Sequence, residues 1–162
     1  METKSYGIRR VVVGVDGSEH AEAALEWAVR MAKGMGSEVI AVFAIAPPIY
    51  FETGYTAPIA PVQFDPEWRA QMQKEFEGTW CKQLRSAGVQ YQTVMEDGRP
   101  ASVIAKVADS FDADVVVVGR RGRGGIAELV LGSVSHELVL HCKRPILLIS
   151  APVQLRPARG AV

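Results

Sequence analysis

Short apolar runs alternate with longer amphipathic segments along most of the chain. Five runs have the length and composition of strands: 11–15, 39–45, 89–95, 114–118 and 145–150. Between them, apolar residues recur at helical spacing in segments that begin at Ser18, Pro66, Pro100 and Ser133. We expect the first and second of these helices to end near Gly36 and Gly88, and the fourth to end before Arg144. Alternating strands and helices predict an α/β fold with an open parallel sheet.

We expect a doubly wound, Rossmann-like five-stranded sheet with strand order 3-2-1-4-5 and helices on both faces. In that order the winding reverses between the first and fourth strands, and ligands bind beyond the carboxyl ends of the strands at such a point. The loops that follow these two strands are residues 14–18, GVDGS, and residues 119–125, GRRGRGG. The order therefore brings a glycine-rich loop to the expected ligand crevice.

Length and composition indicate one globular domain. The chain has 162 residues, with 18 basic and 18 acidic side chains, so its formal net charge is zero. This balance argues against a nucleic-acid partner, because proteins that bind nucleic acids usually have a broad basic surface.

No apolar run approaches the roughly 18 residues of a membrane span. Cys81 and Cys142 form no CxxC motif, so we expect reduced thiols in a cytoplasmic protein.

The predicted domain occupies residues 10–150. We expect residues 1–9 to form a flexible N-terminus and residues 151–162 a disordered tail. The segment 46–65 contains four prolines and no clear period, and a loop of this length is usually functional or disordered.

The glycine-rich loop has the features of a phosphate cradle. Gly119 and Gly122 allow backbone amides to approach a ligand closely. Gly132 precedes Ser133, where a predicted helix adds free N–H groups and the positive end of its dipole. Each hydrogen bond to a charged group contributes on the order of 1.5–3 kcal/mol, so several could hold a triphosphate. The alternative is a plain glycine-rich turn.

Two other glycine motifs fit poorly. A Walker A loop requires a lysine after its last glycine, and no lysine lies between Lys106 and Lys143. Gly122, Gly124 and Ala127 match a dinucleotide fingerprint, but that motif belongs after the first strand and requires an acidic residue about 20 positions later.

Two further motifs lack a required residue. His136, Glu137 and His141 resemble the zinc motif HExxH, but the second histidine is one position late and falls on another face of the helix. Asp16 and Asp97 could supply the acids of a receiver domain, but no lysine follows the fifth strand.

The spacing of Gly119, Gly122, Gly132 and Ser133 is G-x2-G-x9-G-S. This pattern resembles the ATP-binding signature of the universal stress protein family. The segments 11–18, 118–135 and 144–150 are also similar to segments of that family and occur in the same order. The resemblance covers roughly residues 8–150. It implies the family's sheet, which is similar to that of the adenine nucleotide alpha hydrolases.

The resemblance also implies a set of nucleotide-binding residues. Asp16 would contact the ribose or act through a nucleotide-bound magnesium ion; the alternative is that it only bonds backbone amides of its own turn. Arg120 stands where the family commonly has a small polar residue, so its side chain could contact phosphate or face water, and the same alternatives apply to the other arginines of the loop. The full set is Gly14, Val15, Asp16, Ala44, Val118, Gly119, Arg120, Arg121, Gly122, Arg123, Gly124, Gly125, Gly132, Ser133, Val134 and Ser135.

Within this set, Ala44 and Val118 would lie beside the adenine. Gly119, Gly122, Ser133 and Val134 would bind the phosphates.

The resemblance implies a cytoplasmic regulatory protein that binds ATP with magnesium. Residues 145–149 form an apolar edge strand, and both this exposed edge and the resemblance favour a homodimer. We find no base that would activate water, so any ATP hydrolysis should be very slow. Two alternatives are an interaction scaffold that uses residues 46–65 without nucleotide, and a binder of another adenine nucleotide such as cyclic AMP.

Overall fold

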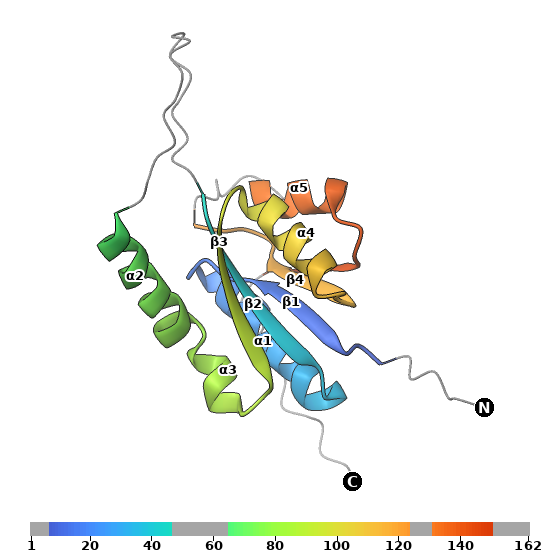
Figure 1. Cartoon of the computed structure of the whole chain (residues 1–162). Coiled ribbons are helices and arrows are strands. Elements are labelled where there is room, and N and C mark those ends of the chain that lie inside the picture. Colours follow the sequence, from blue (N-terminus) through green and yellow to red (C-terminus); the bar gives the residue numbers. More distant parts are fainter. Residues whose placement is uncertain (1–6, 47–64, 124–130, 151–162) are drawn as a thin grey trace, which may run out of the picture.

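A five-stranded parallel sheet with the order β3-β2-β1-β4-β5 forms the centre of the molecule, as predicted (Figure 1). The computed structural model describes residues 7–46, 65–123 and 131–150. The strands are β1 (Arg10–Gly14), β2 (Glu38–Ile45), β3 (Tyr91–Asp97), β4 (Val115–Gly119) and β5 (Ile146–Ile149). Most of the predicted segment 46–65, the terminal segments 1–6 and 151–162, and Gly124 and Gly125 lie outside the described residues.

The middle strand β1 explains the continuous valine runs of the sequence. Val11 pairs with Val39 of β2 on one side and with Val115 of β4 on the other. Helices cover both faces of this central part, so successive side chains are buried whichever way they point. The sequence shows unbroken valines here because neither face of β1 meets water.

The helices are distributed over the two faces of the sheet (Figure 1). Helix α1 packs with the segments between β2 and β3 in one core cluster, and α4 packs with α5 in the other. Their bounds are α1 (Glu19–Met35), α2 (Pro66–Glu75), η1 (Phe76–Trp80), α3 (Lys82–Ala87), α4 (Pro100–Ser110) and α5 (Ser133–His141). No helix in the described part of the chain combines the length and the apolar character needed to cross a membrane.

Helix α1 begins and ends where the sequence predicts. The Ser18 hydroxyl oxygen accepts a hydrogen bond from the Ala21 backbone N–H at 3.2 Å, which caps the first turn. Gly36 follows the last turn with φ of 71°, a left-handed conformation that glycine adopts without steric cost. The α1 ends are thus fixed by local chemistry.

The predicted single helix over 66–88 is instead three consecutive segments. A π-helical stretch, η1, separates α2 from α3, and Phe76 at its start is fully buried. The helix still ends at Gly88, whose φ is 66°. The apolar spacing of four residues does not distinguish an α-helix from one that contains a π turn, so the sequence could not predict this interruption.

Strand β3 begins two residues later than predicted. The alternating pattern starts at Val89, but pairing with β2 begins at Tyr91, which lies opposite Val39. Most of β3 is only half-buried because it lies at the edge of the sheet. Its apolar pattern therefore marks its ends less sharply than that of a central strand.

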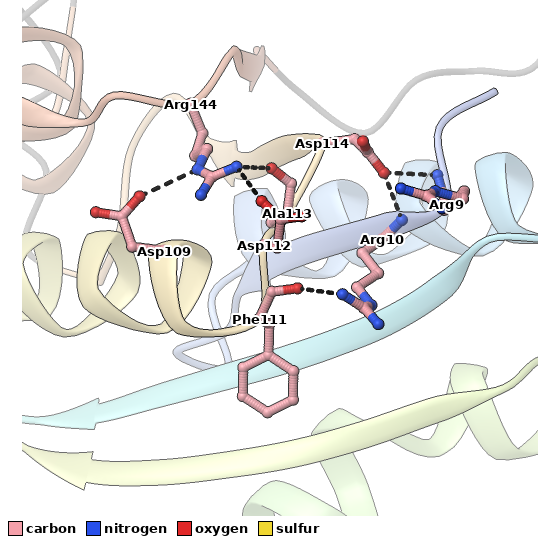
Figure 2. A network of polar contacts seen from close by, with 8 residues as sticks. All are labelled: Arg9, Arg10, Asp109, Phe111, Asp112, Ala113, Asp114 and Arg144. Carbon is pink, nitrogen blue, oxygen red and sulfur yellow. Dashed lines mark hydrogen bonds and ion pairs between the residues drawn. The ribbon is translucent and has the colours of Figure 1, made fainter. Parts of the chain in front are cut away.

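Ion pairs and hydrogen bonds join the segments at the opposite end of the sheet from the glycine-rich loop (Figure 2). Arg144, just before β5, donates to the side chains of Asp109 at 3.0 Å and Asp112 at 2.9 Å. It also donates to the carbonyl of Ala113 at 3.2 Å. These bonds fix the turn between α4 and β4, where Asp112 has a φ of 49°.

Asp114 fixes the start of β1 in the same region (Figure 2). One of its carboxylate oxygens accepts hydrogen bonds from the backbone N–H groups of Arg9 at 2.7 Å and Arg10 at 2.9 Å. Burial raises the pKa of Asp114, but the hydrogen bonds from Arg10 and Arg9 and their charges outweigh it, so the pKa lies below the ordinary value of 3.8. The ionised carboxylate therefore stabilises this corner.

Candidate functional site

A cavity of about 290 Å³ lies at the carboxyl ends of β1 and β4, where the winding of the sheet reverses. This is the expected ligand crevice of a doubly wound sheet. The predicted residues that line it are Gly14, Val15, Asp16, Ala44, Val118, Gly119, Arg121, Gly122, Arg123, Gly132, Ser133, Val134 and Ser135. Segments more than 100 positions apart in the sequence thus meet at one site.

Six lining residues were not predicted: Ala21, Val42, Phe43, Pro100, Ile104 and Leu131. Pro100 and Ile104 belong to α4, the crossover helix between β3 and β4. The sequence marks Ile104 only as an inward-facing residue of that helix. The predicted topology could have indicated that the start of this crossover overhangs the crevice, but no single motif does so.

Asp16 connects the two loops that form the crevice. One carboxylate oxygen accepts a hydrogen bond from the Ser18 N–H at 2.9 Å, which shapes the turn before α1. The other accepts from the Arg123 N–H at 3.2 Å. Asp16 therefore does more than bond its own turn: it ties that turn to the glycine-rich loop after β4.

Two glycines at this site pack closely against other parts of the protein. A Cβ atom at Gly14 would lie 2.8 Å from Cδ1 of Ile104 and 3.0 Å from Cγ1 of Val118. A Cβ atom at Gly119 would lie 2.7 Å from the carbonyl carbon of His20, in the first turn of α1. The contact with the His20 backbone explains Gly119 without any ligand, whereas the atom nearest to Gly14 is the end of the flexible Ile104 side chain.

Gly122 and Gly132 lie within the glycine-rich loop itself. A Cβ atom at Gly132 would lie 3.2 Å from Cα of Arg121, so this glycine lets the two ends of the loop meet. A Cβ atom at Gly122 would lie 2.8 Å from the Asp16 oxygen that bonds Arg123. A side chain at position 122 would thus enter the space beside the carboxylate.

The ends of the loop are held by backbone bonds. The Gly132 N–H donates to the carbonyl of Arg120 at 2.8 Å, and the Arg120 N–H donates to the carbonyl of Ile149 at 2.7 Å. The buried Ser135 hydroxyl lies 2.8 Å from the Arg120 carbonyl. Arg120 does not line the cavity, so its predicted phosphate contact stays a prediction.

Helix α5 points its N-terminus at the cavity. Its N-cap residue is Gly132, which has no side chain that could cap the helix, and the exposed Ser133 follows. The first N–H groups of any helix have no intrahelical partner, and they carry the positive end of the helix dipole. Ser133 and Val134 line the cavity, so this end of α5 favours an anion there.

The charged groups around the cavity are mainly basic. Arg121 and Arg123 line it, and Asp16 is the carboxylate among its lining residues. Among the described residues, no group of three or more histidine, cysteine, aspartate or glutamate side chains could hold a metal ion. A divalent cation here would need ligand oxygens and water to complete its coordination.

Neither cysteine lines the cavity, and both are free thiols. Burial, with a smaller effect of the Glu77 carboxylate, raises the pKa of the Cys81 thiol to about 12. A thiol with this pKa stays protonated and unreactive at neutral pH. Cys81 therefore belongs to the core, where it packs with Phe76 and Leu84.

A model of the universal stress protein family matches residues 7–150 of the chain. The universal stress protein YxiE of Bacillus subtilis is 30% identical over 148 residues, which cover 86% of this chain and 97% of that protein.

Two solved structures share the fold at lower identity. A universal stress protein in complex with cAMP has a TM-score of 0.66 at 23% identity, with coverage of 89% of this chain and 98% of that chain. The universal stress protein of Archaeoglobus fulgidus in complex with dAMP has a TM-score of 0.61 at 22% identity, with coverage of 88% and 98%.

Proposed function

The chain belongs to the universal stress protein family, and from this premise we propose that the cavity between β1 and β4 binds an adenine nucleotide, with ATP as the ligand. One observation carries the proposal. The Asp16 turn, the glycine-rich loop and the N-terminus of α5 line the same cavity at the point where the sheet reverses. In such sheets this point is the usual ligand site.

The cavity has an apolar part that suits a planar base. Val42, Ala44, Ile104 and Val118 all line it, and Val118 and Ile104 are almost fully buried. Ligand pockets are typically apolar with a few polar groups that fix orientation. We place the adenine against these side chains and the ribose beside Asp16.

The opposite part of the cavity suits phosphates. Gly122 of the loop lines the cavity without a side chain, and α5 offers its first N–H groups. Arg121 and Arg123 add positive charge. Charge-assisted hydrogen bonds of this kind contribute on the order of 1.5–3 kcal/mol each, so a few of them would favour a polyphosphate over adenosine.

Magnesium would enter with the nucleotide. The Asp16 carboxylate already accepts two backbone hydrogen bonds, which leaves lone pairs on both oxygens for a hydrated cation. Magnesium commonly binds one or two carboxylates together with phosphate oxygens and water. When bound, it would neutralise phosphate charge, and Asp16 would hold it near the loop.

A different adenine nucleotide is the main alternative ligand. Two solved universal stress proteins of the same fold are described as complexes with cAMP and dAMP, each of which carries one phosphate. Arg121, Arg123 and the N-terminus of α5 offer several separate positive groups, of which a single phosphate would meet fewer than a triphosphate. This distribution of charge is the reason to prefer ATP.

We infer a regulatory role rather than catalysis. Among the lining residues, Asp16 is the candidate base for activating water, and both of its oxygens already accept backbone hydrogen bonds. Hydrolysis should therefore be slow, and the bound nucleotide would act as a signal. We propose a cytoplasmic homodimer that pairs through β5. A nucleotide-independent scaffold that uses residues 46–65 is the rival function.

The test has two parts. Mass spectrometry of the small molecules released by denaturing the purified protein would identify any nucleotide that is retained. Calorimetric titration of the stripped protein with ATP, ADP, AMP and cyclic AMP, with and without magnesium, would then rank the ligands. ATP should bind most tightly and should depend on magnesium. If none of the four binds, the nucleotide proposal fails and the scaffold is favoured.

A further inference from the structure

Trp80 lies outside the lining of the cavity but contacts two residues that belong to it. The Phe43 ring meets the Trp80 ring edge-on, with centroids 5.0 Å apart. The Arg123 guanidinium lies over the same Trp80 ring, 4.6 Å from its centroid. Phe43 comes from the β2 side of the cavity and Arg123 from the glycine-rich loop, so Trp80 contacts residues from both sides of the site.

Gly17 makes the stack of Arg123 on Trp80 possible. Its φ is 76°, and a Cβ atom there would lie 2.6 Å from Nη2 of Arg123 and 2.6 Å from Cε2 of Trp80. No side chain fits at position 17 without separating the guanidinium from the ring. The turn before α1, the π-helical segment and the glycine-rich loop therefore meet at one packed point.

Trp80 also lines a second cavity on the α1 face of the sheet. This cavity measures about 430 Å³ and includes Gly17, Ser18, Glu22 and Gln83. Val15 lines both cavities, so the two are adjacent. Trp80 lies in η1, and π-helical turns are frequent at functional sites.

We propose that Arg123 moves between the Trp80 ring and the phosphates of a bound nucleotide, so that phosphate occupancy changes the packing of Trp80 and the shape of the second cavity. This inference rests on the proposed nucleotide site. At an exposed position a cation–π contact is weak, whereas a guanidinium binds phosphate through stronger charge-assisted bonds. A ligand that binds one arrangement better shifts the population toward it.

The anchoring of Arg123 confines the movement to its side chain. Its backbone N–H is held by Asp16, which also fixes the turn that carries Gly17. The guanidinium can therefore change partner while the loop backbone stays in place. Nucleotides with longer phosphate chains should draw it from Trp80 more completely.

Nuclear magnetic resonance of the tryptophan indole N–H groups would test this in the full chain. The sequence has three tryptophans, Trp27, Trp68 and Trp80, and Trp80→Phe assigns the relevant signal by its loss. At saturation, ATP should shift the Trp80 signal at least twice as far as adenosine does. Equal shifts with both ligands would overturn the inference.

A matched pair of variants separates this role from a structural one. Arg123→Gln should abolish the difference between ATP and adenosine at Trp80, and Arg123→Lys should retain part of it. Arg30 stacks on Trp27 at 5.4 Å and does not line the nucleotide cavity, so Arg30→Gln should shift only the Trp27 signal.

Calorimetry on the same samples distinguishes a failure of this inference from a failure of the proposed nucleotide site. If ATP binds but the Trp80 response survives in Arg123→Gln, the inference is wrong and the nucleotide site stands. If no nucleotide binds to the wild type, both the site and the inference are wrong.

Discussion

The carboxylate of Asp16 accepts a hydrogen bond from the backbone N–H of Arg123 at 3.2 Å, across 107 positions of the sequence. This contact joins the loop after β1 to the loop after β4. The same carboxylate bonds Ser18 at the start of α1. A single side chain thus bonds both loops that form the cavity, and the binding properties of the cavity should depend on it.

Replacing this carboxylate should weaken nucleotide binding without unfolding the protein. In Asp16→Asn an NH2 group replaces one carboxylate oxygen, so the side chain can no longer accept hydrogen bonds from both Ser18 and Arg123. The negative charge that would hold magnesium is also gone. We expect the Kd for ATP to rise about tenfold, a change of about 1.4 kcal/mol. Calorimetry with and without magnesium measures it.

Asp65→Asn is the matched control for Asp16→Asn. Asp65 also accepts a hydrogen bond from a backbone N–H, that of Glu67 at 3.1 Å, but it caps α2 and does not line the cavity. The ATP affinity of the Asp65→Asn variant should equal that of the wild type. If both variants lose affinity alike, the effect of Asp16 is not specific to the site.

A side chain at position 122 should displace the Asp16 carboxylate, which ties the two loops together, and so weaken nucleotide binding. In Gly122→Val the Cβ atom alone would approach the Asp16 oxygen to 2.8 Å, and the methyl groups would extend into the same space. ATP affinity should fall at least about tenfold. Gly34→Ala is the control, since a Cβ atom there meets nothing within 4 Å. That change in helix α1 should raise stability by up to about 1 kcal/mol and leave binding unchanged.

Circular dichroism and thermal unfolding establish that Gly122→Val is folded before its affinity is compared. A folded variant with wild-type ATP affinity would show that the ligand does not use this loop.

The sequence predicts the middle of the sheet well because β1 and β4 are buried on both faces. The valine run of β1 and the glycine spacing after β4 both carry information that is local in the chain. Local information also explains the capping of α1 by Ser18 and Gly36. For these elements, the topology rules of α/β proteins were enough to predict that two distant loops meet at one crevice.

Contacts between distant segments could not be predicted in the same way. Gly119 is required by its approach to His20, and nothing near either residue in the sequence indicates that packing. Phe43 and Ile104 look like ordinary core residues, yet they line the cavity. The stack of Arg123 on Trp80 likewise depends on a π-helical turn that the apolar period does not reveal.

The Asp114 corner should make stability depend on pH in acid. Its pKa is lowered in the folded state, so its contribution is fully present above the unfolded value near 3.8 and is lost as pH falls through the lower folded value. Asp114→Asn keeps an acceptor oxygen but cannot titrate. Urea unfolding should show the variant less stable at pH 6, with the difference shrinking below about pH 4. A difference that stays constant from pH 6 to pH 2.5 would contradict this role.

Pairing through β5 should depend on the amides that face away from β4. The carbonyls of Pro145 and Ile149 accept from Val116 and Arg120 of the β4 side, so by the two-residue period Leu147 also faces β4. The amide of Leu148 then faces the open edge. Leu148→Pro should remove an edge donor and convert a dimer to a folded monomer, as measured by light scattering.

Leu147→Pro is the informative comparison for that experiment. It removes a donor toward β4, so it should lower the thermal midpoint more than Leu148→Pro does. A monomeric wild type would refute the proposed dimer outright. A folded Leu148→Pro variant that remains dimeric would show that another surface makes the contact.

Hydrolysis of ATP should be very slow. Asp16 is the candidate base among the cavity residues, and its oxygens are engaged by Ser18 and Arg123. We expect a turnover number far below the enzyme median of about 10 per second. Steady-state release of phosphate measures it. A rate near that median that disappears in Gly122→Val would reveal a catalytic arrangement beyond the described contacts.

Mapping the ATP site by the backbone amide resonances of the full chain tests the central claim most directly. Saturating ATP with magnesium should shift the signals of Gly14, Gly122, Ser133 and Val134, which line the cavity, and leave the Asp114 signal at the opposite end of the sheet unchanged. Shifts confined to other surfaces, or no shifts at any ATP concentration up to saturation of solubility, would contradict the assignment of this cavity as the nucleotide site.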